Sequence, residues 1–355
     1  MNIHVPNSTT VVACLGGPKT AFEHRTVTPP SAGEMLLRLR TVGFCGTDLF
    51  KLDSGQAKPG MVLGHEIIGD VAALGPGVHE FAVGDRVAVP HHVPCGACVY
   101  CKGGSDTMCE TFKENLMLPG GFADWITIQP RAVSHAARLI PDAITDAQAV
   151  FMEPAACVLR GVERADIRKG GVACVMGAGS MGLLHLLVIN AARPDVSVVM
   201  IDPVADRQKQ SLAFGAAGAA EPGDAALKVV QRASDGFGAD AVFDTVGGAA
   251  LLRAGLDLTR AGGSVVLFAH APDGQKADFD LNALFKNERR IIGTYSGALA
   301  EQERVFDLIV SGALDPTPLV THTMPLDDFD VGVALARDRQ ALKVLFTPTT
   351  DAIAK

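Results

Sequence analysis

The chain has 355 residues, is 48% hydrophobic and carries a formal net charge of -8, which gives enough apolar material for the cores of two domains. The acidic balance offers no general electrostatic reason to bind nucleic acid or an anionic membrane, so we expect a small-molecule partner and neither of those two. The opening "MNIHVPNS" lacks the basic start and apolar run of a signal peptide, and no window reaches the roughly 18 to 20 apolar residues of a membrane span. A cytoplasmic protein is expected.

From residue 9 to about residue 90, short β-branched runs alternate with turns. The runs are "TTVVACL", "EMLLRLRTVGF", "EIIGDVAALG" and "DRVAVP", and glycine and proline separate them. This pattern is typical of short antiparallel strands. The first part of the chain is therefore predicted to be a β-rich domain.

Two residues of this β-rich segment carry side chains that zinc binds. Cys45 lies between glycines in "VGFCGTDLF", and His65 follows twenty residues later in "GHE". A catalytic zinc takes two or three N, S or O ligands from the protein and keeps one exchangeable position. The carboxylate that completes the set is Glu66, Glu153 in "FMEPAAC", or both. Asp48 is better placed to accept a hydrogen bond from the histidine and fix its tautomer.

Four of the eight cysteines form a tight cluster with the pattern C-x2-C-x2-C-x7-C. In a reducing compartment such a cluster is more often a metal site than a pair of disulfides. Four thiolates on one lobe suit tetrahedral zinc with no open position, which is a structural site. The lobe is expected at about residues 91–113, and its ligands are Cys95, Cys98, Cys101 and Cys109.

After the lobe, "GGFADWITI" predicts a strand, and "ITDAQAVFMEPAACVLRGVERA" predicts one helix with Thr145 as its cap. At residue 171 the pattern changes to apolar strands separated by helices, in "GVACVMGAGSMGLLHLLVINAA", "VSVVMID", "ADAVFDTVG", "GGSVVLFAH" and "RRIIGTYS". Such alternation predicts a parallel sheet covered on both faces. The tail is expected to end in a helix and a strand.

A glycine turn joins the first of these strands to its helix, and an acid follows at the end of the next strand. The turn has the pattern G-x-G-x-x-G, which lets pyrophosphate approach the backbone at a helix N-terminus. The acid, Asp202, would accept hydrogen bonds from the ribose hydroxyls and repel a 2′-phosphate, which favours NAD over NADP. Arg207 is a candidate for the adenosine end. The expected cofactor-binding residues of the turn are Gly177, Gly179, Ser180, Met181 and Gly182.

The segments "CGTD", "GHE", "EPAA" and "GAGSMG", together with the four-cysteine lobe, resemble the zinc-dependent medium-chain dehydrogenase/reductase family in order and spacing. The match spans essentially the whole chain. "GHE" and "EP" look like the sorbitol, threonine and polyol dehydrogenase branch. The resemblance implies an α/β fold, with a GroES-like catalytic domain at 1–155 and 296–355 and a Rossmann NAD-binding domain at 156–295.

The same resemblance implies a reaction and its residues. Cys45, His65 and one or both of Glu66 and Glu153 would hold a catalytic zinc, and Thr47 matches the hydroxyl residue that starts the proton relay. With NAD and two zinc ions per chain, the enzyme would oxidise a secondary alcohol, such as a polyol, sugar or cyclitol, to a ketone. A homotetramer is expected, and a dimer is the alternative.

Two positions depart from the family pattern. Many members have a histidine five residues after the catalytic cysteine, where this chain has Phe50, and the sorbitol enzymes have an Arg-Tyr pair where it has Ser296 and Gly297. A pocket less polar than a straight-chain hexitol requires is therefore expected, which favours a cyclic, shorter or partly apolar alcohol. Reduction of an activated C=C bond, or a dinucleotide-binding role without turnover, are the alternative functions.

Overall fold

The structure is a computed structural model that describes residues 4–353 and divides into two compact units. The first unit comprises the chain up to Pro154, Ala298–Val310 and the part from Asp315 onward. The second unit comprises Ala155–Gly297 and Ser311–Leu314. Within the described part, no helix combines the length and the apolar character needed to cross a bilayer.

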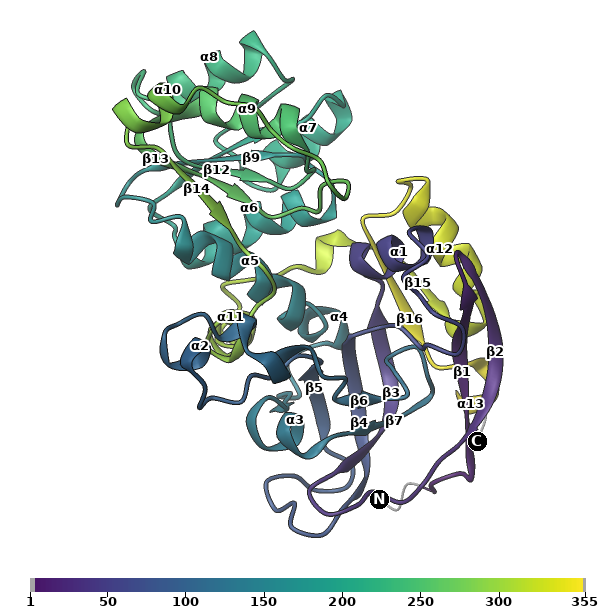
Figure 1. The fold of residues 1–355 in the computed structure, drawn as a ribbon. Helices are drawn as coiled ribbons and strands as arrows, with labels where there is room; N and C mark the ends of the chain where they lie inside the picture. Colours follow the sequence, from purple (N-terminus) through teal and green to yellow (C-terminus); the bar gives the residue numbers. More distant parts are fainter. Residues whose placement is uncertain (1–3, 354–355) are drawn as a thin grey trace. The chain divides into compact units, whose positions relative to one another are not determined.

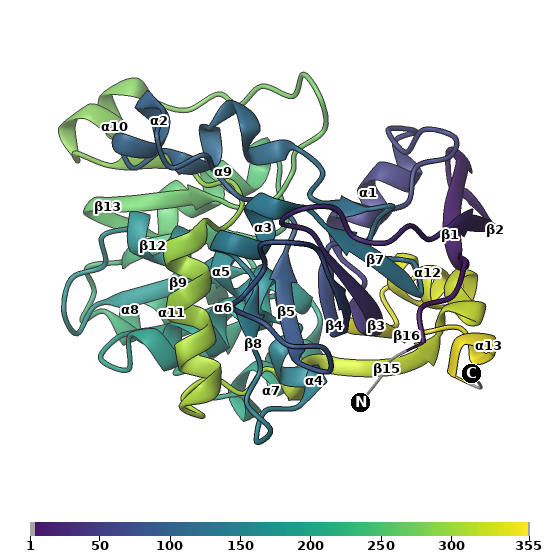
Figure 2. The same cartoon turned by 90° about the horizontal axis from the view of Figure 1, so that it is seen from below.

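The first unit is built on an eight-stranded, mainly antiparallel sheet. Its main path runs β15-β16-β3-β4-β5-β8, and β7 joins it through β3. Strands from the two ends of the chain lie side by side here, because β16 pairs with β3 (Figure 2). The bounds are β3 Met35–Gly43, β4 Glu66–Leu74, β5 Arg86–Pro90, β6 Met117–Leu118, β7 Trp125–Ile128, β8 Arg138–Leu139, β15 Val320–Pro325 and β16 Lys343–Thr347. A separate hairpin joins β1 Ser8–Gly16 to β2 Lys19–Thr26.

Four buried aromatic rings form the centre of this unit's core. Phe44, Phe122, Phe329 and Phe346 contact one another with ring centroids 4.8 to 6.3 Å apart. Phe44 follows β3 directly, and its N–H donates to the Val344 carbonyl at 2.9 Å. The residue after Phe44 is therefore held at a fixed position at the edge of the core.

One long helix was expected over residues 144–165, and this prediction is wrong: two helices form, α4 Asp146–Ala149 and α5 Met152–Arg164. The Thr145 cap is confirmed, because its hydroxyl accepts from the Gln148 N–H at 3.2 Å. Pro154 explains the break. In a continuous helix its ring would clash with the carbonyl four residues earlier, whereas in the first turn of α5 its missing N–H has no cost.

The remaining helices of the first unit are short. The predicted helix and strand of the tail are confirmed as α12 and β16. The helices are α1 Gly46–Asp53, α2 Val99–Lys102, α3 Pro130–His135, α11 Leu299–Val310, α12 Phe329–Arg337 and α13 Thr350–Ile353.

The second unit contains a six-stranded parallel sheet in the order β11-β10-β9-β12-β13-β14. Its central strands β9 and β12 are fully buried, as a sheet covered by helices on both faces requires, and β9 is apolar throughout. Figure 1 shows α9 on one side of this sheet and α6 on the other. The strands are β9 Val172–Met176, β10 Ser197–Ile201, β11 Gly218–Ala220, β12 Ala239–Asp244, β13 Thr259–Leu267 and β14 Arg290–Gly293. The helices are α6 Ser180–Ala192, α7 Ala205–Ala213, α8 Asp224–Ala233, α9 Ala249–Leu258 and α10 Leu281–Lys286. The predicted α/β class and parallel sheet are confirmed.

Candidate active site and metal centres

Cys45 caps the N-terminus of α1, immediately after the core residue Phe44. Its Sγ accepts from the Thr47 N–H at 3.5 Å, and its own N–H donates to Asp48 Oδ2 at 3.1 Å. The second of these bonds, together with the approach of the Asp48 N–H to the Cys45 side chain, forms a capping box. The positive end of a helix favours a thiolate over a thiol, which is the form that binds a metal.

Asp48 joins Cys45 to His65. This carboxylate is fully buried, and its Oδ1 accepts from the Gly64 N–H at 3.3 Å and lies 3.3 Å from His65 Nδ1. Burial opposes ionisation, but His65 and the two backbone donors outweigh it and lower the pKa of Asp48. Burial likewise opposes a charged ring, yet Asp48 and Cys45 raise the pKa of His65 well above its usual range. With Nδ1 directed at Asp48, Nε2 is the ring nitrogen of His65 that remains for a metal, which would bind it with loss of the Nε2 proton.

Glu66 is the first residue of β4 and lies opposite Gly43 of β3. A Cβ at Gly43 would overlap Glu66 Oε2, so only glycine leaves room for this carboxylate. Lys343 Nζ donates to the same oxygen, and both side chains are buried. Burial acts against the ammonium, but Glu66, Cys45 and Glu153 together raise the pKa of Lys343. Glu66 Oε1 is buried and has no hydrogen-bond partner within residues 4–353.

Two histidines that the sequence analysis did not identify follow β5. The His91 ring lies 4.5 Å from His65 and 3.5 Å from His92, between centroids, and His91 Nδ1 is 3.9 Å from Glu153 Oε1. Burial and the neighbouring His65 hold the pKa of His91 well below its usual range, and the same causes lower that of His92 to about 3. The signal in the sequence was a histidine pair between a strand and the first zinc-lobe cysteine.

These side chains form two overlapping groups of metal-ligand atoms, in each of which all atoms lie within 4.8 Å of one another. One group contains Cys45, His65 and Glu66, and the other contains His65, His91 and Glu153. The donors are sulfur, nitrogen and oxygen, which is the set that zinc prefers. The buried, unpartnered Glu66 Oε1 is an atom that a cation would satisfy, so these residues fit a zinc ion.

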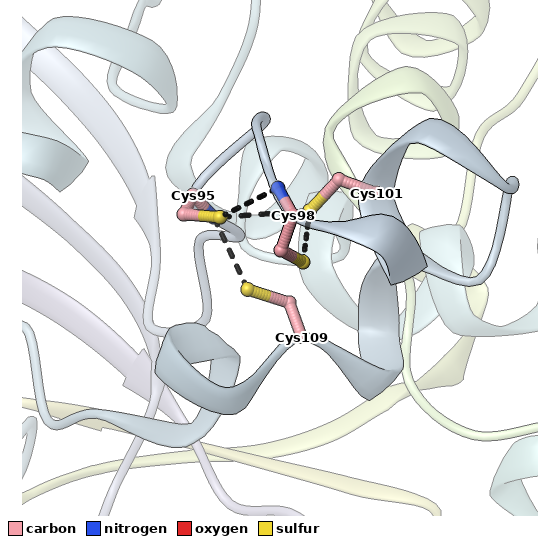
Figure 3. Close-up of side chains that lie close together, drawn as sticks. All are labelled: Cys95, Cys98, Cys101 and Cys109. Carbon is pink, nitrogen blue, oxygen red and sulfur yellow. Dashed lines mark hydrogen bonds between the residues drawn. The ribbon is translucent and has the colours of Figure 1, made fainter.

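The four cysteines of the second metal centre turn their sulfur atoms toward one another (Figure 3). Sγ of Cys101 lies 3.5 Å from Sγ of Cys98 and 3.9 Å from Sγ of Cys95. Zn–S bonds of about 2.3 Å in a tetrahedron require sulfurs roughly 3.8 Å apart. Burial opposes ionisation of Cys109, but the Thr111 hydroxyl and the Cys95 N–H lower its pKa to about 6. The four thiols fit a structural zinc.

The glycine turn lies between β9 and α6 in the second unit. Gly177 has φ +98, a conformation that side chains disfavour. A Cβ at Gly182 would overlap the Gly177 carbonyl oxygen, whereas the space around Gly179 is open. Ser180 and Met181 form the first turn of α6. The turn is thus closely packed on one side and has open space where its second glycine lies.

Asp202 follows β10 and is fixed by backbone donors. Its Oδ2 accepts from the Ala178 N–H at 2.8 Å, and its Oδ1 accepts from the Val204 N–H at 2.9 Å. Arg207 lies with a guanidinium nitrogen 3.8 Å from Oδ2. Each carboxylate oxygen keeps a second lone pair for a further donor.

Known proteins resemble the chain over nearly its whole length. The family described as "Alcohol dehydrogenase GroES-like domain" matches residues 31–140, and "Zinc-binding dehydrogenase" matches residues 177–311. The erythritol/L-threitol dehydrogenase of Mycolicibacterium smegmatis is 31% identical, over 98% of this chain and all of that protein. The sorbitol dehydrogenase of Halalkalibacterium halodurans is 28% identical, over 92% and 95% respectively. Acetophenone reductase from Geotrichum candidum, solved with NAD, has a TM-score of 0.82 at 27% identity, over 97% of this chain and 98% of that structure.

The chain belongs to the zinc-containing medium-chain dehydrogenase/reductase family of alcohol and polyol dehydrogenases. The resemblance drawn from its motifs is confirmed, and so is the combination of a GroES-like domain with a Rossmann domain. The chain is a zinc-dependent dehydrogenase.

Proposed function

We propose that the protein oxidises a secondary alcohol to a ketone with NAD, using a zinc held by Cys45, His65 and Glu66. The observation that carries this proposal is the Glu66 carboxylate. One oxygen is held by Lys343, while the other is buried without a partner among the described residues, within 4.8 Å of the ligand atoms of Cys45 and His65. A buried carboxylate oxygen in that position is strongly disfavoured unless a cation satisfies it.

Each residue of the proposed site has a separate task. When bound, zinc lowers the pKa of an alcohol and favours loss of hydride, which NAD accepts. Asp48 orients the His65 ring, and the capping box holds the Cys45 sulfur. Thr47, two residues beyond Cys45, would accept a hydrogen bond from the alcohol and start the relay by passing its own hydroxyl proton on toward water. Glu153, in the first turn of α5, has its ligand atom within 4.8 Å of that of His65, and it would serve as the alternative or the additional carboxylate for this metal.

We assign the dinucleotide to the glycine turn of the second unit, with Asp202 on the adenosine ribose. Its two oxygens already accept from backbone N–H groups, so the carboxylate is held in place to receive ribose hydroxyls. The same negative charge would repel a 2′-phosphate, which supports NAD over NADP. Arg207 lies beside Asp202 and would cover the adenosine end.

The proposed substrate is a cyclic, shorter or partly apolar secondary alcohol rather than a straight-chain hexitol. Gly297 supports this proposal, because a Cβ there would lie 2.6 Å from the backbone carbon of Ala156. The polar side chain that sorbitol enzymes carry in this segment therefore has no room. Phe50 on α1 replaces the relay histidine with a group that carries no proton.

The experiment is NADH formation across secondary alcohols, polyols, cyclitols and sugars, with NADP compared and one arm stripped of metal and reloaded with zinc. We expect NAD-linked activity that disappears with the metal and returns with zinc. Strong turnover of sorbitol with little of cyclic alcohols would overturn the substrate proposal. Activity only on an enone with reduced cofactor would replace alcohol oxidation by reduction of a C=C bond.

A further inference from the structure

We propose that His91 is a protein ligand of the catalytic metal, through Nδ1, at the coordination position that a substrate oxygen must take. This inference rests on the proposed function, since it concerns the metal held by Cys45 and His65. It adds a residue that the zinc motifs of the sequence do not contain.

The distances allow the assignment. The ligand atoms of His65, His91 and Glu153 all lie within 4.8 Å of one another, and His91 Nδ1 is 3.9 Å from Glu153 Oε1. Two N or O ligands at about 2.0–2.1 Å from a tetrahedral zinc are roughly 3.3 Å apart. Movements of a few tenths of an ångström in each side chain would bring this pair to that spacing.

The ring of His91 is packed, but its buried nitrogen is not satisfied. His65 lies against one part of the ring and His92 against another, and His92 in turn contacts Phe112 with centroids 4.8 Å apart. Nδ1 of His91 is buried and has no hydrogen-bond partner in the part of the chain that the structure describes. If the His91 ring served only to stack on its neighbours, a phenylalanine ring would do so equally well. A metal gives the buried lone pair a partner and avoids the cost of leaving it unpaired.

The pairing of Glu66 with Lys343 leaves room for a further ligand. Because Lys343 holds one oxygen of Glu66, this residue offers the metal a single oxygen. His65 belongs to both groups of ligand atoms, so a metal held by Cys45, His65 and Glu66 would lie near His91 and Glu153, and a neutral imidazole could join it without changing the net charge. A neutral alcohol that took the place of His91 would also leave the net charge unchanged, so His91 would occupy that place until substrate binds.

The test uses the full-length protein with Co²⁺ in the catalytic position and Zn²⁺ in the four-cysteine lobe. Each imidazole bound to Co²⁺ carries one exchangeable ring N–H whose proton resonance is strongly shifted and is lost in D₂O. We expect two such resonances in the unsubstituted protein, one in His91→Phe and two in His92→Phe. His92→Phe is the matched control, since it keeps an aromatic ring between His91 and Phe112. Zinc affinity, measured by chelator competition, should fall at least about tenfold in His91→Phe only.

One shifted resonance in the unsubstituted protein, or two in His91→Phe, would overturn the assignment. His91→Ala with added imidazole is the second variant, and restoration of the second resonance by imidazole is expected. Absence of the thiolate-to-cobalt absorption band from Cys45 would refute the proposed function itself. If the thiolate-to-cobalt band is present but only one shifted N–H resonance is seen, the assignment of His91 as a ligand is refuted and the proposed function stands. The two failures are therefore distinguishable.

Discussion

Replacing Lys343 by methionine should destabilise the first unit strongly, because it leaves the Glu66 charge buried. The Glu66 side chain is 0% exposed and the Lys343 side chain 5%, so water cannot take over the lost interaction. Removing one partner of such a pair costs about 3–5 kcal/mol, whereas replacing both is often close to neutral. We therefore expect Lys343→Met to lower the free energy of unfolding by about that amount, and the double variant Lys343→Met/Glu66→Gln to recover most of it.

The chain offers a specific probe for this measurement. Trp125 is its single tryptophan and lies buried in β7, in the same sheet as Lys343 and Glu66. Urea unfolding followed by tryptophan fluorescence, on zinc-free protein throughout, therefore reports on the first unit. Lys58→Met, at an exposed lysine, is the matched control and should stay within about 0.5 kcal/mol of the unsubstituted chain. A loss below about 1 kcal/mol in Lys343→Met, or a double variant no more stable than it, would refute the reasoning.

Three further predictions concern other parts of the chain. Burial lowers the pKa of His185 to about 4, while the ring in the unfolded chain titrates near 6.5. Acid therefore favours the unfolded state, and the free energy of unfolding of the second unit should fall by about 2 kcal/mol between pH 7 and pH 5. His185→Leu should remove that loss, as amide hydrogen exchange in β9 at both pH values would show; an unchanged pH dependence contradicts it. Cys109→Ser should reduce the zinc content from two ions per chain to one, measured by elemental analysis, and retention of both would mean that the lobe holds zinc with three thiolates. Asp202→Asn should lower the preference for NAD over NADP, measured as the ratio of the two kcat/KM values, by about tenfold. The reason is that about 1.4 kcal/mol of repulsion between the carboxylate and the 2′-phosphate is lost. An unchanged ratio would mean that the ribose does not bind at Asp202.

The features that could be predicted from the sequence are those whose residues lie close together along the chain. Cys45 with Asp48, and Gly177 with Gly182, lie within a few residues of each other, so their spacing already encodes a capping box and a tight turn. The break between α4 and α5 also has a local cause, Pro154. The apolar periodicity on both sides of this proline nevertheless favoured one continuous helix.

The residues that were missed depend on contacts between distant segments. Lys343 appears in the sequence as one charge inside an apolar strand, and its partner is known only once β16 pairs with β3. His91 appears as half of a histidine pair, and its position beside His65 and Glu153 follows from β5, β4 and α5 together. No spacing rule along the chain links these segments.

The pairing of Glu66 with Lys343 also imposes an order of events during synthesis. The two residues are 277 positions apart, and at about 5–20 residues per second the ribosome needs roughly 15–55 s to travel between them. During that interval the whole of Ala155–Gly297 emerges, so the second unit has all of its sheet while Glu66 still lacks its lysine. The nascent chain therefore contains every proposed metal ligand before it contains Lys343, and Glu66 gains its lysine partner only when the last strand is released.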